Sequence, residues 1–158
     1  MPKSKGVAVV GSGYWGRNHV RVFHELGALT HICEIESTVL EKCQDQYDGV
    51  VCTSRYEDVL ADPNIRAVVL ATPAVTHFEL AREALEARKD VLVEKPLSLN
   101  VGDGAKLVDL ADRMNSILMV GHILLYHPAV EKLKGMVDSG ELGKIQSIQR
   151  MLDQLSRE

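Results

Sequence analysis

The stretch that decides the fold lies at the start of the chain and reads Gly6-Val7-Ala8-Val9-Val10-Gly11-Ser12-Gly13-Tyr14-Trp15-Gly16. Its first part, Gly6 to Val10, is apolar and rich in β-branched residues, which is typical of a parallel strand covered on both faces. A glycine turn follows at once, and the pattern then predicts a helix from about Tyr14 to Leu26 that Gly27 stops. The sequence therefore opens with a strand, a tight turn and a helix.

The turn has the spacing G-x-G-x-x-G, and each glycine would have its own task in binding a dinucleotide. Gly11 permits the tight turn, Gly13 lets a pyrophosphate approach the backbone without a Cβ in the way, and Gly16 lets the helix lie close to the strand. The unpaired N–H groups and the positive dipole end of the helix would face the phosphates. Three glycines alone are a weak signal, so the surrounding elements decide the interpretation.

An acidic residue supports a dinucleotide site. A second apolar strand, Leu29 to Cys33, ends at Glu34, about 20 residues beyond the turn, where a carboxylate for the ribose is expected. The alternative is that Glu34 is only a solvated strand end. The sequence predicts that the dinucleotide contacts Gly11, Gly13, Tyr14, Trp15, Gly16 and Glu34.

The rest of the chain alternates between helical and extended patterns. A short third strand is expected to begin with Val50 and Val51, and further strands are expected over Ile65–Leu70, over Val91–Val93 and over Ile117–Val120. Helices are expected over Ser37–Gln46 with Ser37 as N-cap, briefly over Tyr56–Leu60, over Thr76–Ala87 with Thr76 as N-cap, from Ser98 or Asn100 to about Asn115, and from Pro128 to Ser139. This order predicts an α/β protein, a Rossmann-type doubly wound parallel sheet with helices on both faces.

Polar residues follow the last two of these strands, and in such a sheet the carboxyl ends of the strands border the ligand crevice. Lys95 stands after the fifth strand, where it would be a proton donor or an electrostatic clamp for a carbinol oxygen, or else an ordinary surface lysine. His122, Tyr126 and His127 follow the sixth strand. They are candidates for substrate contacts, or they are structural polar groups at strand and helix ends.

Composition narrows the class of protein. The chain has 158 residues, of which 46% are hydrophobic and 25% charged, and a net charge of -4, so we expect a single domain that binds no nucleic acid. It shows no signal peptide and no apolar run of membrane-spanning length, so we expect a cytoplasmic protein. The three cysteines lack a C-x-x-C pair, which favours buried free thiols. The six histidines form no metal-site pattern, so no metal is expected.

Four motifs, taken together, resemble the Gfo/Idh/MocA oxidoreductase family. They are the run Gly11 to Asn18, Ala71-Thr72-Pro73 with His77, Glu94-Lys95-Pro96, and Gly121-His122 with His127-Pro128-Ala129. Within the family the chain looks most like the bacterial UDP-N-acetylglucosamine, or uronate, 3-dehydrogenases.

The resemblance implies roles for these residues. The glycines would hold the pyrophosphate of NAD, Glu34 would bind its ribose, and Lys95 would position the substrate and shuttle the hydroxyl proton. It also implies that Thr72, Pro73, His77, Glu94 and Lys95 border the cofactor, and that Pro96 follows a cis peptide bond. Glu34 replaces the family's common aspartate, and its charge should repel a 2′-phosphate, so NAD is expected and NADP is less favoured.

The resemblance implies that family members continue into a C-terminal α/β domain, which we expect to be absent from this chain. We therefore expect a NAD-binding Rossmann domain over residues 1–143 and a tail over 144–158 that corresponds to the start of the missing substrate domain. The pattern over Ile145–Glu158 fits helical spacing better than alternation, yet Gly143-Lys144 is typical of a lead-in to a strand.

Two functional hypotheses follow. The first is a NAD-dependent oxidoreductase of the sugar or UDP-sugar dehydrogenase type, represented by its cofactor-binding domain. The second is a non-catalytic NAD-binding or interaction module derived from that family. Under either hypothesis we expect a homodimer or higher homo-oligomer, formed through apolar side chains between Lys144 and Leu155.

Overall fold

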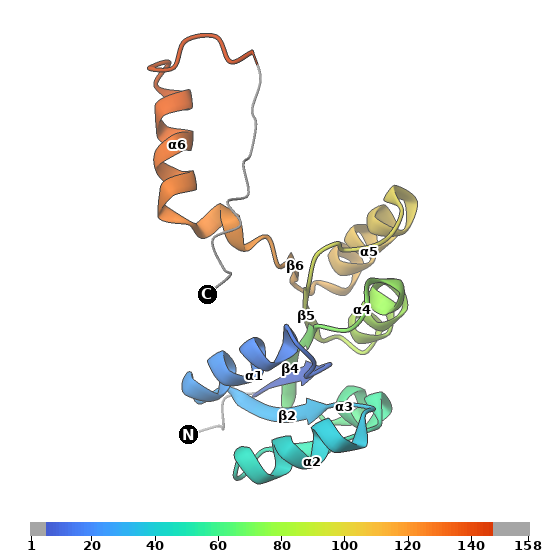
Figure 1. The fold of residues 1–158 in the computed structure, drawn as a ribbon. Coiled ribbons are helices and arrows are strands. Elements are labelled where there is room, and N and C mark those ends of the chain that lie inside the picture. Colours follow the sequence, from blue (N-terminus) through green and yellow to red (C-terminus); the bar gives the residue numbers. More distant parts are fainter. Residues whose placement is uncertain (1–5, 147–158) are drawn as a thin grey trace, which may run out of the picture. The chain divides into compact units, whose positions relative to one another are not determined.

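The computed structural model describes residues 6–146, in which strands and helices alternate along the chain (Figure 1). The strands are β1 (Gly6–Val10), β2 (Leu29–Cys33), β3 (Val51–Thr53), β4 (Ile65–Leu70), β5 (Asp90–Val93) and β6 (Leu118–Val120). The α-helices are α1 (Gly16–Glu25), α2 (Ser37–Gln46), α3 (Tyr56–Ala61), α4 (His77–Glu86), α5 (Val101–Met114) and α6 (Pro128–Asp138). Two short 3₁₀ helices, η1 (Ala74–Thr76) and η2 (Ile123–Tyr126), precede α4 and α6.

The strands form one parallel sheet in the order β3-β2-β1-β4-β5-β6. β1 lies between β2 and β4, with Val9 opposite Ile32 on one side and Val69 on the other. The chain therefore winds outward in one direction from β1 to β3 and in the other from β4 to β6. This confirms the predicted Rossmann-type fold, and it places the expected ligand crevice at the carboxyl ends of β1 and β4, where the winding reverses.

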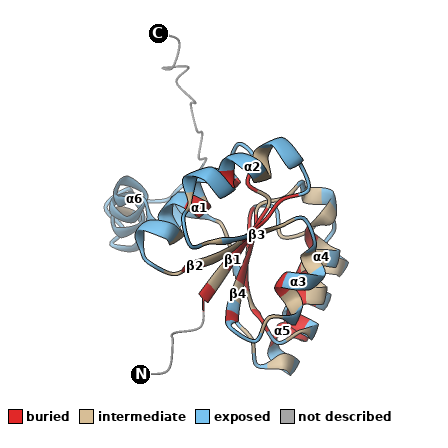
Figure 2. Cartoon of the chain, turned by 90° about the horizontal axis from the view of Figure 1, so that it is seen from below, coloured by how far each residue is buried: buried red, intermediate tan, exposed pale blue. Residues whose placement is uncertain are grey.

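Each face of the sheet has its own hydrophobic core, because successive side chains of a strand point to opposite faces. On one face Ala8 and Val10 contact the apolar sides of α3, α4 and α5, with Leu85 and Leu107 fully buried. On the other face Val9 contacts α1 and α2. Figure 2 shows the buried residues gathered on the strands and on the inner sides of these helices. Because helices cover both faces of the sheet, the central strands consist of continuous apolar runs.

Several helix starts differ from the sequence-based prediction. α1 begins at Gly16 rather than Tyr14, because the turn itself occupies the preceding residues. Ser37 lies inside α2 and does not cap it, and the side chain of Thr76 makes no capping bond to α4. Of the two candidate caps for α5, Asn100 takes the role, and its side chain accepts a 2.9 Å hydrogen bond from the Asp103 N–H.

The chain divides into two compact units, an N-terminal unit that ends at Gly121 and a C-terminal unit that starts at His122. The N-terminal unit holds the complete sheet and α1 to α5, whereas the C-terminal unit holds η2 and α6, which contains no buried residue. The expected boundary at Gly143 thus lies beyond the end of the sheet-bearing unit. The predicted tail falls mostly outside the described residues.

The three cysteines are free thiols in the structure, as the sequence predicts. Cys33 and Cys43 are buried and Cys52 is partly buried. Burial, together with the nearby carboxylate of Glu34, raises the pKa of the Cys33 thiol to about 11. Between residues 6 and 146, no group of His, Cys, Asp and Glu side chains is arranged to hold a metal ion, and no helix combines the length and apolarity that crossing a bilayer requires.

Candidate functional site

The glycine turn after β1 is held in a tight conformation that other residues could not adopt. Gly11 has a φ of +83° and its N–H donates to the Cys33 carbonyl at 2.8 Å. A Cβ placed on Gly16 would lie only 1.9 Å from the Gly11 carbonyl oxygen. Glycine at both positions therefore lets α1 start directly against the end of β1, as the sequence predicts.

The middle of the turn is open. A Cβ placed on Gly13 would meet no atom within 4 Å, and Tyr14 is 79% exposed. In residues 6–146 the backbone N–H groups of Gly13, Tyr14 and Trp15 find no hydrogen-bond acceptor. The Arg17 guanidinium lies 4.8 Å from the centre of the Tyr14 ring and adds positive charge. Free N–H groups at a helix start, with space in front of them, are suited to bind a phosphate.

Glu34 follows β2, and its carboxylate lies against the glycine turn. One carboxylate oxygen, Oε2, accepts hydrogen bonds from the Ser12 N–H at 2.7 Å and the Ser12 hydroxyl at 3.1 Å. The other, Oε1, accepts from the Glu36 N–H at 3.1 Å. Glu34 is only 9% exposed, so the alternative of a solvated strand end is wrong. Ser12 was not among the site residues predicted from the sequence, although a hydroxyl between two glycines was a usable signal.

Glu94 follows β5 and joins two parts of the site. Its Oε1 accepts hydrogen bonds from the Trp15 indole at 2.6 Å and from Nε2 of His19 at 2.7 Å. Its Oε2 accepts from the Lys95 N–H at 3.2 Å. His19 was likewise not among the site residues predicted from the sequence. Its position four residues after Trp15 puts it on the same side of α1, and this spacing could have revealed it.

Lys95 and Thr72 stand at the carboxyl ends of neighbouring strands, β5 and β4. The side chain of Lys95 is exposed, as is Pro73, and the Lys95–Pro96 peptide bond is cis, as the family resemblance implies. The Thr72 hydroxyl lies 2.8 Å from the Thr76 hydroxyl, within hydrogen-bonding distance. The two segments therefore border the same edge of the sheet as the glycine turn.

His77 lies beneath these two segments and is 1% exposed. Its Nδ1 is 2.7 Å from the Pro96 carbonyl oxygen and its Nε2 is 2.9 Å from the Thr72 carbonyl oxygen. Carbonyl oxygens only accept hydrogen bonds and a neutral imidazole carries one N–H, so the ring donates to one of these two carbonyls and lies close to the other. His77 therefore packs between the Thr72 and Pro96 segments.

His122, Tyr126 and His127 belong to the C-terminal unit. The His127 side chain caps α6, since its Nδ1 accepts a 3.1 Å hydrogen bond from the Ala129 N–H. Helix capping is the structural role that the sequence left open for His127 as the alternative to a substrate contact. The carbonyl of His122 accepts from the Leu125 N–H within η2, and Tyr126 is largely exposed. The structure thus brings together the predicted site residues of the N-terminal unit, whereas His122, Tyr126 and His127 belong to the C-terminal unit.

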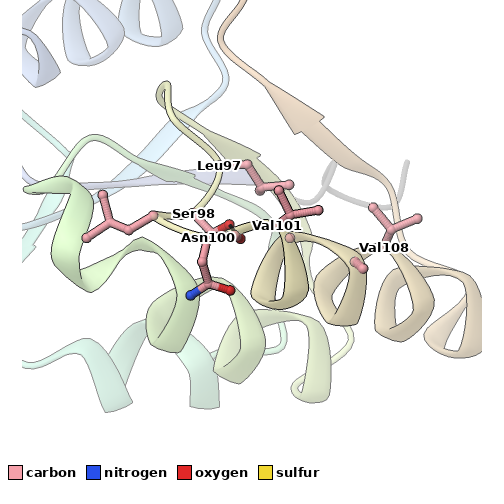
Figure 3. Close-up of a pocket in the computed structure, with 8 residues that line it drawn as sticks. Leu97, Ser98, Asn100, Val101 and Val108 are labelled. Carbon is pink, nitrogen blue, oxygen red and sulfur yellow. Dashed lines mark hydrogen bonds between the residues drawn. The ribbon is translucent and has the colours of Figure 1, made fainter.

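An open groove of about 520 Å³ lies at the start of α5. Figure 3 shows side chains from the Pro96–α5 connection and from α5 itself around it, among them Leu97, Ser98, Asn100, Val101 and Val108. None of its lining residues is charged. Because it offers no cation or free carboxylate, it does not supply the contacts that a pyrophosphate or a ribose needs.

Comparison with known proteins identifies the family. A sequence model described as "Oxidoreductase family, NAD-binding Rossmann fold" matches residues 5–122, which include the whole sheet and every site residue of the N-terminal unit. The chain belongs to the Gfo/Idh/MocA family. Its members bind NAD through a Rossmann domain, so the predicted class of fold, cofactor and enzyme is confirmed at this level.

The relatives include enzymes that act on cyclic polyols and on nucleotide sugars. An inositol 2-dehydrogenase/D-chiro-inositol 3-dehydrogenase of Lactiplantibacillus plantarum is 31% identical over 144 residues, which are 87% of this chain and 41% of that protein. A dTDP-3,4-didehydro-2,6-dideoxy-alpha-D-glucose 3-reductase of Saccharopolyspora spinosa is 39% identical over 90 residues, 57% of this chain and 27% of that protein. The chain spans about two fifths of the length of the first of these relatives.

Solved structures agree with this grouping. The crystal structure of myo-inositol 2-dehydrogenase from Lactobacillus plantarum matches with a TM-score of 0.79 and 28% identity, over 90% of this chain and 43% of that one. A 3-ketoreductase variant from Actinomadura kijaniata, crystallised with TDP-benzene and NADP, matches with a TM-score of 0.79 and 25% identity, over 88% of this chain and 45% of that one. Relatives of this chain therefore include a protein that binds NADP.

Proposed function

We propose that the N-terminal unit binds NAD at the glycine turn and serves as the cofactor-binding part of an oxidoreductase that acts on a ring alcohol. The observation that carries this proposal is the open turn, where, among residues 6–146, the N–H groups of Gly13, Tyr14 and Trp15 have no acceptor and no atom fills the space beside Gly13. The pyrophosphate would lie there. Glu34 would receive the ribose hydroxyls, and Gly11 and Gly16 would keep the turn close to the sheet.

Bound NAD supplies a hydride acceptor, and the chain's own residues would arrange the alcohol beside it. Lys95 is exposed at the end of β5, where its ammonium group can orient a substrate hydroxyl and exchange its proton. Thr72 and Pro73 would border the nicotinamide from the end of β4. His77 would keep the Thr72 and Pro96 segments in place, because its two ring nitrogens lie against their carbonyl oxygens.

The substrate class that fits the relatives is a sugar or a cyclic polyol. Within this class we keep the UDP-sugar type, UDP-N-acetylglucosamine or its uronate, as the finer proposal, and inositol as its direct competitor. His122, Tyr126 and His127 would contribute to the substrate side. We further infer a cytoplasmic enzyme that works as a homo-oligomer.

Calorimetric titration of the chain with NAD tests the cofactor proposal, and Gly13→Val is the matched negative control. Absence of NAD binding to the folded parent would overturn it. Absorbance of reduced cofactor, followed with NAD and a panel of myo-inositol, UDP-N-acetylglucosamine and its uronate, then tests turnover. Binding without turnover of any of these would favour the alternative, a non-catalytic NAD-binding module.

A further inference from the structure

Glu94 stands out because a buried carboxylate at the end of β5 collects donors from two separate segments. It is 7% exposed. From α1 and the residue before it come the His19 ring nitrogen and the Trp15 indole, and from its own strand end comes the Lys95 N–H. Neither segment is a sequence neighbour of the other, so the carboxylate is the direct polar link between the glycine turn and Lys95.

The surroundings fix this carboxylate in place. A Cβ placed on Gly121, just after β6, would lie 3.1 Å from Oε2 and 3.2 Å from Oε1 of Glu94. The His19 ring is stacked on Phe23, with centroids 6.5 Å apart. Glu94 therefore has little room to change its rotamer, and its oxygens are already engaged by donors. Such a group is poorly placed to bind a ligand itself.

Trp15 connects the Glu94 carboxylate to the open glycine turn. Trp15 is the residue immediately before α1, and its own backbone N–H is one of the free groups at the open turn. Its indole is bonded to Glu94, which in turn accepts from the Lys95 N–H. A phosphate that draws on the turn's N–H groups would thus act on Trp15, and through Glu94 on the backbone of Lys95.

We propose that Glu94 is a positioning residue that joins the glycine turn to Lys95, so that filling the turn alters the backbone at Lys95. This inference rests on the proposed function, because it assumes that the turn holds the pyrophosphate of NAD. Glu94 acts through hydrogen bonds to Trp15 and Lys95 and touches no reacting atom. It follows that the two motifs behave as one unit although β1 and β5 are separated by β4 in the sheet.

The first test needs no ligand. Trp15 is the sole tryptophan of the chain, so its indole N–H gives a single, self-assigned signal in a ¹⁵N NMR spectrum. Trp15→Phe should shift the Lys95 amide signal, and this shift should be about threefold smaller or less when Glu94→Gln is already present, because a coupled pair is not additive. Glu41→Gln, at an exposed carboxylate on α2, is the control and should leave both signals in place. Additive shifts in the double variant would overturn the link.

The second test uses ADP-ribose as the probe, since it carries the pyrophosphate but no nicotinamide. In the parent, the amides of Gly13 and Lys95 should shift together with one apparent Kd. In Glu94→Gln the Gly13 amide should still respond, the Lys95 amide should respond much less, and the affinity should fall by about 2- to 10-fold, the loss expected for one hydrogen bond.

The outcomes separate the two proposals. If Gly13 responds to ADP-ribose and Lys95 does not, or if Lys95 responds equally in Glu94→Gln, the positioning role is overturned while the cofactor site stands. If Gly13 itself does not respond, the cofactor site is overturned, and the ligand-free measurement still decides whether Glu94 couples Trp15 to Lys95.

Discussion

Two glycines of the turn have opposite surroundings, although the sequence motif treats them alike. Gly13 faces open space, whereas a Cβ on Gly16 would overlap the Gly11 carbonyl. The first glycine is therefore needed for a ligand and the second for the fold. This difference lets binding and stability be separated by single substitutions.

Gly13→Val should abolish NAD binding and leave the protein folded, because its side chain would occupy the path of the pyrophosphate and nothing else. Gly16→Ala should instead lower the free energy of unfolding by about 3 kcal/mol or more, since the added methyl group forces backbone atoms apart. Calorimetry with NAD and urea unfolding followed by circular dichroism measure the two effects. A Gly13→Val protein that binds NAD like the parent would contradict the assignment of the turn.

Glu34 should set the preference for NAD over NADP. The carboxylate is held by Ser12 and Glu36 and has no freedom to withdraw, so a 2′-phosphate on the ribose would meet its charge. The parent should bind NAD more tightly, and Glu34→Ala should narrow the gap between the two cofactors. Titration of both cofactors into both proteins provides the measurement.

A matched control for this test is Glu36→Gln, which removes a nearby exposed charge but leaves the Glu34 carboxylate in place. The cofactor preference should survive this change. Equal affinity of the parent for NAD and NADP would refute the role of Glu34. The crystallised relative that holds NADP makes the comparison informative within the family.

At the scale of elements, the start of α5 depends on one side chain. Asn100 accepts from the Asp103 N–H and satisfies one of the free donors of the first turn. Asn100→Ala should lower the free energy of unfolding by about 1 kcal/mol. Ser98→Ala should cost less, because that hydroxyl donates to the Asn100 carbonyl, which also accepts from the Gly104 N–H, and it satisfies none of the free N–H donors of the first turn. Chemical denaturation of both variants tests the order, and a larger loss for Ser98→Ala would contradict the assignment of the cap.

The amino-terminal edge of the sheet is held by Asp90, which accepts from Arg66 on β4 at 2.5 Å and from the Ile117 N–H at 2.9 Å. Partial burial alone would raise the pKa of the Asp90 carboxyl, but the hydrogen bonds from Arg66 and Ile117 lower it below its ordinary value. A lowered pKa means that the stabilisation is fully present above the ordinary carboxyl pKa and is lost as the pH falls through the folded value.

Asp90→Asn should therefore destabilise the protein at neutral pH and lose less stability than the parent on acidification. Urea unfolding at a series of pH values from neutral to strongly acidic would measure this. Asp109→Asn, at an exposed position on α5, is the control and should keep the acid dependence of the parent. Parallel curves for Asp90→Asn and the parent would show that the link between β4, β5 and β6 does not depend on ionised Asp90.

At the scale of the whole molecule, apolar side chains on the C-terminal unit lack cover within the described part of the chain. Val130, Leu133 and Val137 repeat at helical spacing along α6, and each is at least 37% exposed. Exposed apolar stripes of this kind are typical of interaction surfaces. Further apolar residues stand between Ile145 and Leu155 in the sequence, and most of them lie outside the described residues.

We expect the 158-residue chain to self-associate through this region, with a twofold dimer as the simplest closed arrangement. Sedimentation analysis of the parent and of a variant that ends at Gly143 would test the role of the tail. Leu133→Glu would test the role of α6 in the same measurement. A parent that stays monomeric at high concentration would refute the prediction.

Local sequence signals predicted the class of fold correctly and pointed to the candidate site. Runs of β-branched residues, glycines at turn spacing and helical periodicity are local signals, and they placed β1, β2, β4 and α2 at their observed bounds. The same local chemistry marked the glycine turn, Glu34 and Lys95. These residues could be found because strand ends in a doubly wound sheet converge on one edge whatever the details of side-chain contact.

The tertiary structure alone decided how the site residues are connected. That Glu34 bonds to Ser12, that Glu94 takes donors from Trp15, His19 and Lys95, and that His77 lies beneath two loops depend on contacts between distant parts of the chain. Sequence patterns carry periodicity along one element, but they carry no information on which side chains meet across neighbouring strands. The family resemblance implies that Glu94 and His77 border the cofactor, and the structure adds that both are buried and that their polar atoms lie against protein groups.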